Sequence, residues 1–303
     1  MLNHLPRPKP FVFVRRGALG LISMLLCCAA AADDRIDDVM YQDPAFPPET
    51  PHAEFSDKLK PLWLEALNRP ESELQRLAAD TIALAHRSGM PGLGDTANKL
   101  IAIVQTQELE PTVRNAAARA LVALDANQAA EAFGKAMDSC SLEMAAIIEP
   151  ALARWNYVPA REIWRQRLDD SATQRARLLL AITCLGAVKD ADASAAVLAI
   201  VTDANARPPI RIAAARAAAK INDNALLESA IKLTAADGDQ PMANLLATTL
   251  LTSQTSSDAV SFLKQMAASD STAVSGLALR RLFEIDPTNV YEFAEKSISS
   301  NDV

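Results

Sequence analysis

Arginine and aromatic side chains gather in one stretch of the chain, and these residue types contribute most of the binding energy at protein interfaces. Positions 154–177 hold two of the three Trp residues and six Arg, in a chain that is acidic overall. We expect Tyr157, Arg161, Trp164 and Arg165 to form a surface that binds an acidic or polar segment of a partner protein. The alternative interpretation is structural, because Arg175 in the same stretch falls at a position where Arg recurs in the repeat described below.

The sequence offers little for catalysis or for metal binding. Beyond residue 32 its histidines are His52 and His86, and neither has a further ligand at a spacing typical of a zinc or iron site. We find no Gly-rich phosphate loop, nucleophile elbow or calcium loop. The paired acids Asp169 and Asp170 are more typical of a solvated loop than of a catalytic dyad. We therefore expect no catalytic residue, no cofactor and no metal, and a protein that is not an enzyme.

Two of the four cysteines lie beyond residue 32, at Cys140 and Cys184. We place them on corresponding helices of successive repeats, about 20 Å apart along the helix direction. A disulfide requires Cα atoms within about 7 Å. We expect two buried or half-buried thiols and no intramolecular disulfide.

Residues 1–32 have the layout of a secretory signal peptide. A basic leader precedes an uncharged, mostly apolar run over residues 17–32, which is shorter than the roughly 20 residues that span a bilayer. The basic residues are Arg7, Lys9, Arg15 and Arg16. We expect cleavage near Ala32, no membrane span after cleavage, and a periplasmic or extracellular protein. An uncleaved anchor, lipidation of a leader cysteine and twin-arginine export are the alternatives.

The net charge argues against nucleic acid as a partner. The whole chain has 30 basic and 37 acidic residues, and removal of the four basic residues of the leader increases the excess of acids from 7 to 11. A phosphate backbone would on average be repelled.

One sequence motif occurs twice and sets the fold class. Residues 111–121 read PTVRNAAARAL, and residues 208–218 read PPIRIAAARAA. The two copies are roughly a hundred residues apart, about three periods of a helical repeat. The many alanines let neighbouring helices pack closely, and one helix pair cannot bury its apolar faces without further pairs beside it.

We divide the chain into a signal peptide (1–32), a Pro-rich disordered linker (33–56) and a helical repeat domain (57–303). A short helix over 59–67 opens the domain, and seven antiparallel helix pairs follow. The pairs are predicted at 71–87 and 95–107, 111–124 and 128–137, 142–155 and 159–168, 173–186 and 192–202, 208–221 and 225–235, 241–252 and 258–267, and 272–285 and 289–299. The expected fold is an all-α solenoid, a right-handed superhelix of about seven pairs.

The motif Pro-x-Val/Ile-Arg-x-Ala-Ala-Ala-Arg-Ala, followed by an Asn/Asp turn and a second helix with spaced Leu, resembles the HEAT repeat. It is most similar to the short HEAT-like repeats of the phycobilisome-lyase type, over about residues 71–303. The resemblance implies a solenoid whose second helices line a concave, partner-binding face. We expect a non-enzymatic, exported scaffold that holds a protein or peptide. A lyase or isomerase that acts on a bound ligand, and a structural spacer of the cell envelope, are the alternatives.

Overall fold

The computed structural model describes residues 55–221, 225–237, 240–291 and 293. The described residues belong to one compact unit of the chain. The predicted signal peptide and residues 33–54 of the predicted linker lie outside them, so both remain predictions.

The described part of the chain contains α-helices and short 3₁₀ turns, and no strand. The α-helices are α3 (Leu59–Ala66), α4 (Ser72–Arg87), α5 (Ala97–Gln105), α6 (Pro111–Ala123), α7 (Ala130–Ala136), α8 (Leu142–Arg154), α9 (Val158–Asp169), α10 (Arg175–Ala187), α11 (Ser194–Thr202), α12 (Pro208–Ile221), α13 (Leu226–Asp237), α14 (Pro241–Leu250), α15 (Ser257–Ala267) and α16 (Thr272–Ile285). These bounds lie close to those predicted from the sequence. Of the last predicted second helix, only the 3₁₀ turn Pro287–Val290 and two further residues are described.

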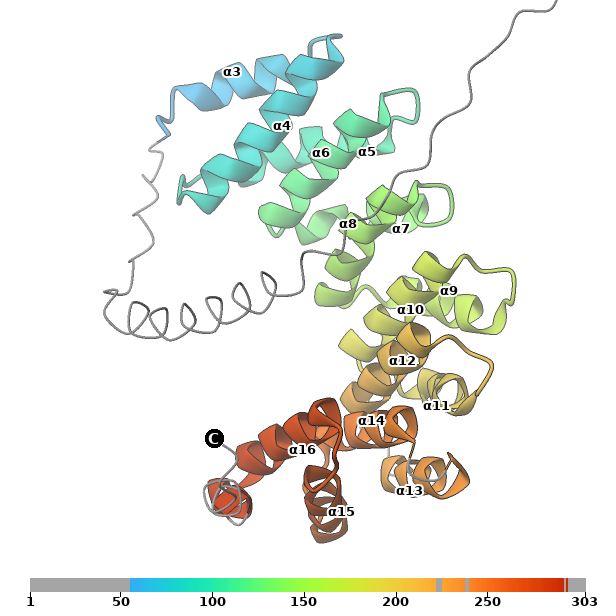
Figure 1. The fold of residues 1–303 in the computed structure, drawn as a ribbon. Coiled ribbons are helices and arrows are strands. Elements are labelled where there is room, and N and C mark those ends of the chain that lie inside the picture. The colour runs from blue at the N-terminus through green and yellow to red at the C-terminus, as the bar shows by residue number, and fades with distance from the viewer. Residues whose placement is uncertain (1–54, 222–224, 238–239, 292, 294–303) are drawn as a thin grey trace, which may run out of the picture. The chain divides into compact units, whose positions relative to one another are not determined.

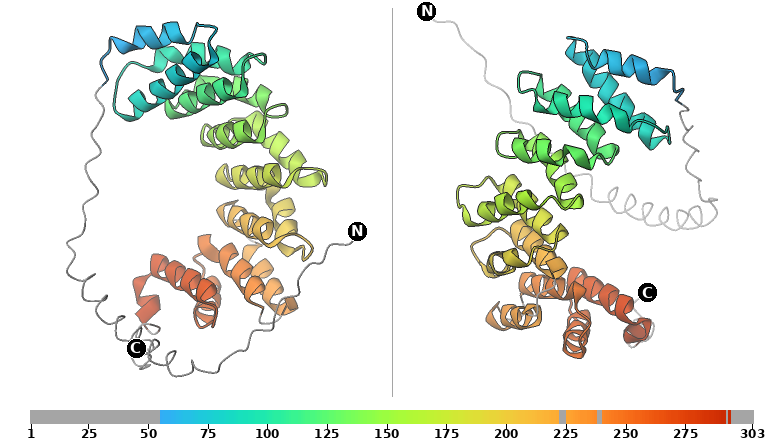
Figure 2. Two further views of the ribbon diagram at one scale, coloured as in Figure 1. Left: turned by 45° about the horizontal axis from the view of Figure 1, so that its top comes forward. Right: turned by 180° about the vertical axis from the view of Figure 1, so that it is seen from behind.

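The helices stack in two rows (Figure 1). The first helices of the pairs, α4, α6, α8, α10, α12, α14 and α16, each pack on the next helix of the same row. The second helices, from α5 to α15, run alongside this row, and Figure 2 shows the stack from two further sides. Each repeat contacts its neighbours in the series, as in a solenoid. The predicted fold class, an all-α solenoid of helix pairs, is confirmed.

The motif that occurs twice forms the contact between repeats. Its alanines are buried in α6 and α12, except Ala213, which is partly buried; Ala116, Ala117 and Ala214 have no exposed surface. The arginine of each copy donates from Nε to the last turn of the preceding second helix. Arg114 reaches the Val104 carbonyl at 3.2 Å, and Arg211 reaches the Val201 carbonyl at 2.9 Å. A cation is favourable at a helix C-terminus, where carbonyls lack intrahelical partners, so both arginines are structural.

Four first helices end in the same turn. A residue with positive φ follows each of them: Gly89, Asp125, Asn156 and Lys189. In each turn the N–H of the next residue donates to the carbonyl five positions earlier, at 3.0 Å, which is the Schellman arrangement. The turn fixes where each second helix starts, and the residue after Lys189 is the buried Asp190.

Candidate functional site

The predicted Arg and Trp surface lies at the contact between α9 and α11. Arg165, on α9, donates from Nη1 to Asp190 Oδ1 at 3.2 Å and to Asp192 Oδ2 at 2.7 Å, and from Nη2 to Glu162 Oε2 at 3.0 Å. Arg161 Nη1 lies 3.6 Å from Asp190 Oδ2. Asp190 is 2% exposed and also accepts the N–H of Ala193, which caps the turn that leads into α11. The two arginines thus join successive second helices.

A second set of charges is buried beneath this contact, around Glu149 of α8. The Glu149 side chain has no exposed surface. Arg167 Nη1 donates to its two oxygens at 2.8 and 2.9 Å, and Trp164 Nε1 donates to Oε2 at 3.0 Å. Arg177 Nη1 lies 3.8 Å from Oε1 and donates to the Met137 carbonyl at 3.0 Å. We call this group, Glu149 with Trp164, Arg167 and Arg177, the Glu149 cluster; it ties α7, α8, α9 and α10 together.

The structure therefore separates the four residues that we predicted to bind a partner. Trp164 has no exposed surface, so its inclusion in a binding surface was wrong: its indole N–H is needed by a buried carboxylate. Tyr157 is half-buried and packs on Gly134 of α7, where a Cβ would lie 2.6 Å from Tyr157 Cε1. Arg161 and Arg165 keep 25% and 29% of their side chains exposed, but their charges face acidic groups of this chain. Binding of a partner at these two arginines stays a prediction.

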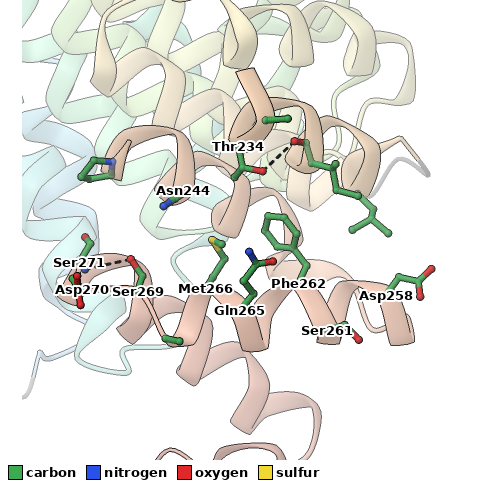
Figure 3. A pocket seen from close by; sticks show the side chains of 15 residues that line it. Thr234, Asn244, Asp258, Ser261, Phe262, Gln265, Met266, Ser269, Asp270 and Ser271 are labelled. Atoms are coloured by element: carbon green, nitrogen blue, oxygen red, sulfur yellow. Dashed lines mark hydrogen bonds between the residues drawn. The ribbon is translucent and has the colours of Figure 1, made fainter. Parts of the chain in front are cut away.

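A cavity of about 1090 Å³ lies elsewhere, between α13 and α15. We call it the α13–α15 groove. α13 contributes Leu227, Ile231 and Thr234, and α15 contributes Phe262 and Gln265, with further residues from α14 and the loop after α15. Ile231 is 50% exposed. Figure 3 shows Phe262 and Gln265 pointing from α15 into the space below Thr234.

The ends of the groove are acidic. Asp258 lies at one end of α15 and Asp270 at the other, with Phe262, Gln265 and Met266 between them (Figure 3). The described residues that line the groove include these two acids and no Lys or Arg. The groove thus offers apolar surface in its middle and negative charge at both ends.

Sequence reasoning missed this groove, although α13 carries a signal for it. Leu226, Ala230 and Leu233 form the buried stripe that the fold requires. Leu227, Ile231 and Thr234 repeat the same spacing one residue later and line the groove. An amphipathic helix needs one apolar stripe to pack on its neighbours, so a second stripe beside it indicates an additional contact surface.

Both cysteines of the described domain are buried and free. Burial raises the pKa of the Cys184 thiol to about 12 and also raises the pKa of the Cys140 thiol. Since the thiolate is the reactive form, both side chains behave as core residues. The predicted burial of the two thiols is confirmed.

The described residues contain no group of three or more His, Cys, Asp or Glu side chains arranged to hold a metal ion. No helix among them is both long and apolar enough to cross a membrane.

The arrangement of helices in this chain is similar to that of a solved structure. No protein-family model matches the chain, and no curated protein is similar to it in sequence. A solved structure of the complex of CpcE and CpcF of phycocyanin lyase from Nostoc sp. PCC7120 is similar in fold, with a TM-score of 0.45 and 17% sequence identity. The match covers 81% of this chain and 93% of that chain. The likeness concerns the arrangement of helices, and it carries no argument about substrate or residues.

This finding corrects one expectation. We predicted that the protein is not an enzyme, from its repeat fold and its lack of a catalytic motif. A chain with a similar arrangement of helices belongs to a lyase. The prediction that the protein is not an enzyme is withdrawn.

Proposed function

We propose that the repeat domain is a protein-binding module and that the α13–α15 groove receives a segment of the partner. The observation that carries this proposal is the groove itself, an open cavity of about 1090 Å³ with an exposed Ile231 and a half-buried Phe262. The lining mixes apolar side chains with hydroxyl, amide and carboxylate groups, and clefts in which placed polar groups accompany apolar surface are common sites of recognition.

The charges of the groove define the chemistry of the segment. Asp258 lies in the first turn of α15 and Asp270 follows its last turn; the helix has 11 residues, which corresponds to about 16 Å along its axis. An extended peptide covers that distance in about five or six residues. The proposed segment thus has Lys or Arg about five positions apart, facing the two acids, and apolar side chains between them that contact Phe262 and Ile231.

Selection of displayed twelve-residue peptides on the purified protein tests the proposal. We expect enrichment of peptides in which two basic residues flank apolar ones. Ile231→Asp and Asp258→Lys are expected to weaken binding of the selected peptides at least tenfold, since they remove apolar contact and invert a charge.

The chain offers matched controls for both variants. Phe283→Asp places the same charge on another exposed apolar residue, on α16 and outside the groove. Glu228→Lys inverts an exposed acid of α13 that does not line the groove. Both controls are expected to bind like the unchanged protein. Selected peptides that bind all four variants equally would show that the groove is not the site.

We also propose that the protein is exported and that residues 1–32 direct its export. The basic leader and the apolar run that follows it support this proposal. Amino-terminal sequencing of the protein from the producing cell is expected to start near Asp33. A mature protein that starts at Met1 and stays with the cytoplasmic fraction would contradict it.

A further inference from the structure

The row of first helices begins with α4, which packs on α6 and on the short helix α3, and one face of α4 stays exposed. Leu77 and Asn115 occupy equivalent positions of their repeats. Leu77 directly follows Arg76, and Asn115 directly follows the equivalent Arg114. Asn115 of α6 is 2% exposed, whereas Leu77 is 46% exposed. The terminal repeats of solenoids usually present a polar outer face, which keeps them soluble. Here the outer position holds leucine.

Three leucines form a stripe on this face of α4, with Thr81 between the second and the third. Leu74, Leu77 and Leu84 are 45%, 46% and 46% exposed. With Thr81 the spacing along the helix is three, four and three residues, which is the spacing of the a and d positions of a coiled coil. We call these four residues the α4 stripe.

The spacing of the α4 stripe is the same in both directions along the helix. When two copies of α4 run antiparallel, Leu74 of one copy lies opposite Leu84 of the other, and Leu77 lies opposite Thr81. The a position of one helix then meets the d position of the second in every layer. A helix of sixteen residues, about 24 Å long, supplies four such layers.

The charges beside the stripe favour the same orientation. Glu73, Asp80 and Arg87 occupy one flanking position of successive heptads, and the two outer residues carry opposite charge. In the antiparallel arrangement Glu73 of each copy faces Arg87 of the other. Asp80 lies near the middle and pairs with Arg119 at 3.0 Å and with Arg76 at 3.1 Å. Arg76 is shared with Glu73, which it holds at 2.6 Å within the chain, so the contact with Arg87 of the other copy would add a second partner for Glu73.

A parallel arrangement lacks this match. Its flanking pairs would set Glu73, Asp80 and Arg87 against the other flanking position of the heptad, which holds Ala78 and Ala85. Charge complementarity is thus present in one orientation and absent in the other.

We propose that two copies of this chain associate through the α4 stripe, with the two α4 helices antiparallel. The inference is independent of the proposed peptide site, because the α13–α15 groove lies in the fifth and sixth helix pairs. Its consequence for binding is that one assembly presents two grooves, so that a partner with two suitable segments is held more tightly than one with a single segment.

Sedimentation velocity of the purified protein over a hundredfold range of concentration tests the proposal. The mass of one chain is 32.5 kDa, and we expect the average mass to approach twice the monomer value as concentration rises. Leu77→Asp is expected to hold the protein at the monomer mass without lowering its melting temperature, because Leu77 is exposed in the single chain. Phe283→Asp serves as the control and is expected to associate like the unchanged protein.

A charge exchange tests the orientation of the two helices. Glu73→Arg and Arg87→Glu are each expected to weaken association about tenfold, and the double variant is expected to restore it. Positions 73 and 87 are about 21 Å apart on one helix, so the two substituted residues cannot form an ion pair within one chain. Restored association of the double variant would therefore come from pairs between the two copies. A protein that stays monomeric at every concentration, or one that associates equally well after Leu77→Asp, would overturn the proposal. Crosslinks between residues 33–54 and α4 in a monomeric protein would also overturn the proposal.

Discussion

The contact between α9 and α11 and the gap between α13 and α15 occupy the same kind of position, between the second helices of successive repeats. In the first, Arg161 and Arg165 reach across to Asp190, and the Glu149 cluster fills the interior beneath them. In the second, the space is a groove of about 1090 Å³ with acidic ends. Residues of a type common at interfaces are thus used to join repeats in one region, and an open groove is left where the repeats are less closely joined.

The largest expected effect on stability comes from a substitution in the Glu149 cluster. Glu149→Gln removes the charge that Arg167 and Arg177 face inside the domain. Loss of one member of a buried ion pair leaves the other without compensation, so we expect a loss of about 3–5 kcal/mol in the free energy of unfolding. Chemical denaturation measures it. Glu143→Gln, an exposed position on the same helix, is the control and should change stability by less than about 0.5 kcal/mol.

Two glycines on first helices have different surroundings, because Gly186 is buried and Gly276 is exposed. A Cβ at Gly186 of α10 would lie 2.7 Å from Ala217 Cα of α12, whereas a Cβ at Gly276 of α16 would meet nothing within 4 Å. Gly186→Ala is therefore expected to destabilise by about 1–3 kcal/mol. Gly276→Ala is expected to stabilise by up to about 1 kcal/mol, because alanine favours helix. Thermal unfolding of both variants decides; equal melting temperatures would contradict the difference in packing.

An intermediate effect is expected where the second helices are joined. Asp190→Ala removes the acceptor that Arg161, Arg165 and the Ala193 N–H share. Hydrogen bonds to charged groups contribute about 1.5–3 kcal/mol, and we expect a loss in that range. Asp192, whose side chain is 81% exposed, also pairs with Arg165. Asp192→Ala should lower the free energy of unfolding by less than about 1 kcal/mol. An equal loss for Asp192→Ala and Asp190→Ala would show that the burial of Asp190 does not determine the size of the effect.

The smallest effect on stability is expected in the groove. Ile231→Asp changes a half-exposed side chain and should leave the free energy of unfolding within about 0.5 kcal/mol of its original value. The same substitution is expected to abolish peptide binding. A large loss of stability would show that Ile231 belongs to the core, and the contrast between the two regions would then fail.

The fold was predictable because its signals are local. Pro111 and Pro208 mark helix starts, the alanines after Arg114 and Arg211 form one face, and the period of the motif identifies a repeat. The site was not predictable in the same way. Trp164 has the residue type of an interface, but its burial depends on Glu149, fifteen residues earlier on another helix. The groove depends on the distance between α13 and α15, which no single helix determines.

Arg114 and Arg211 each bind a carbonyl oxygen that precedes them in the chain. In both repeats the donor follows its acceptor carbonyl by ten residues in the chain. Contacts between residues close in sequence form quickly. During synthesis each arginine therefore leaves the ribosome after the carbonyl that it binds, and a repeat can be attached to the one before it while the rest of the chain is still being made.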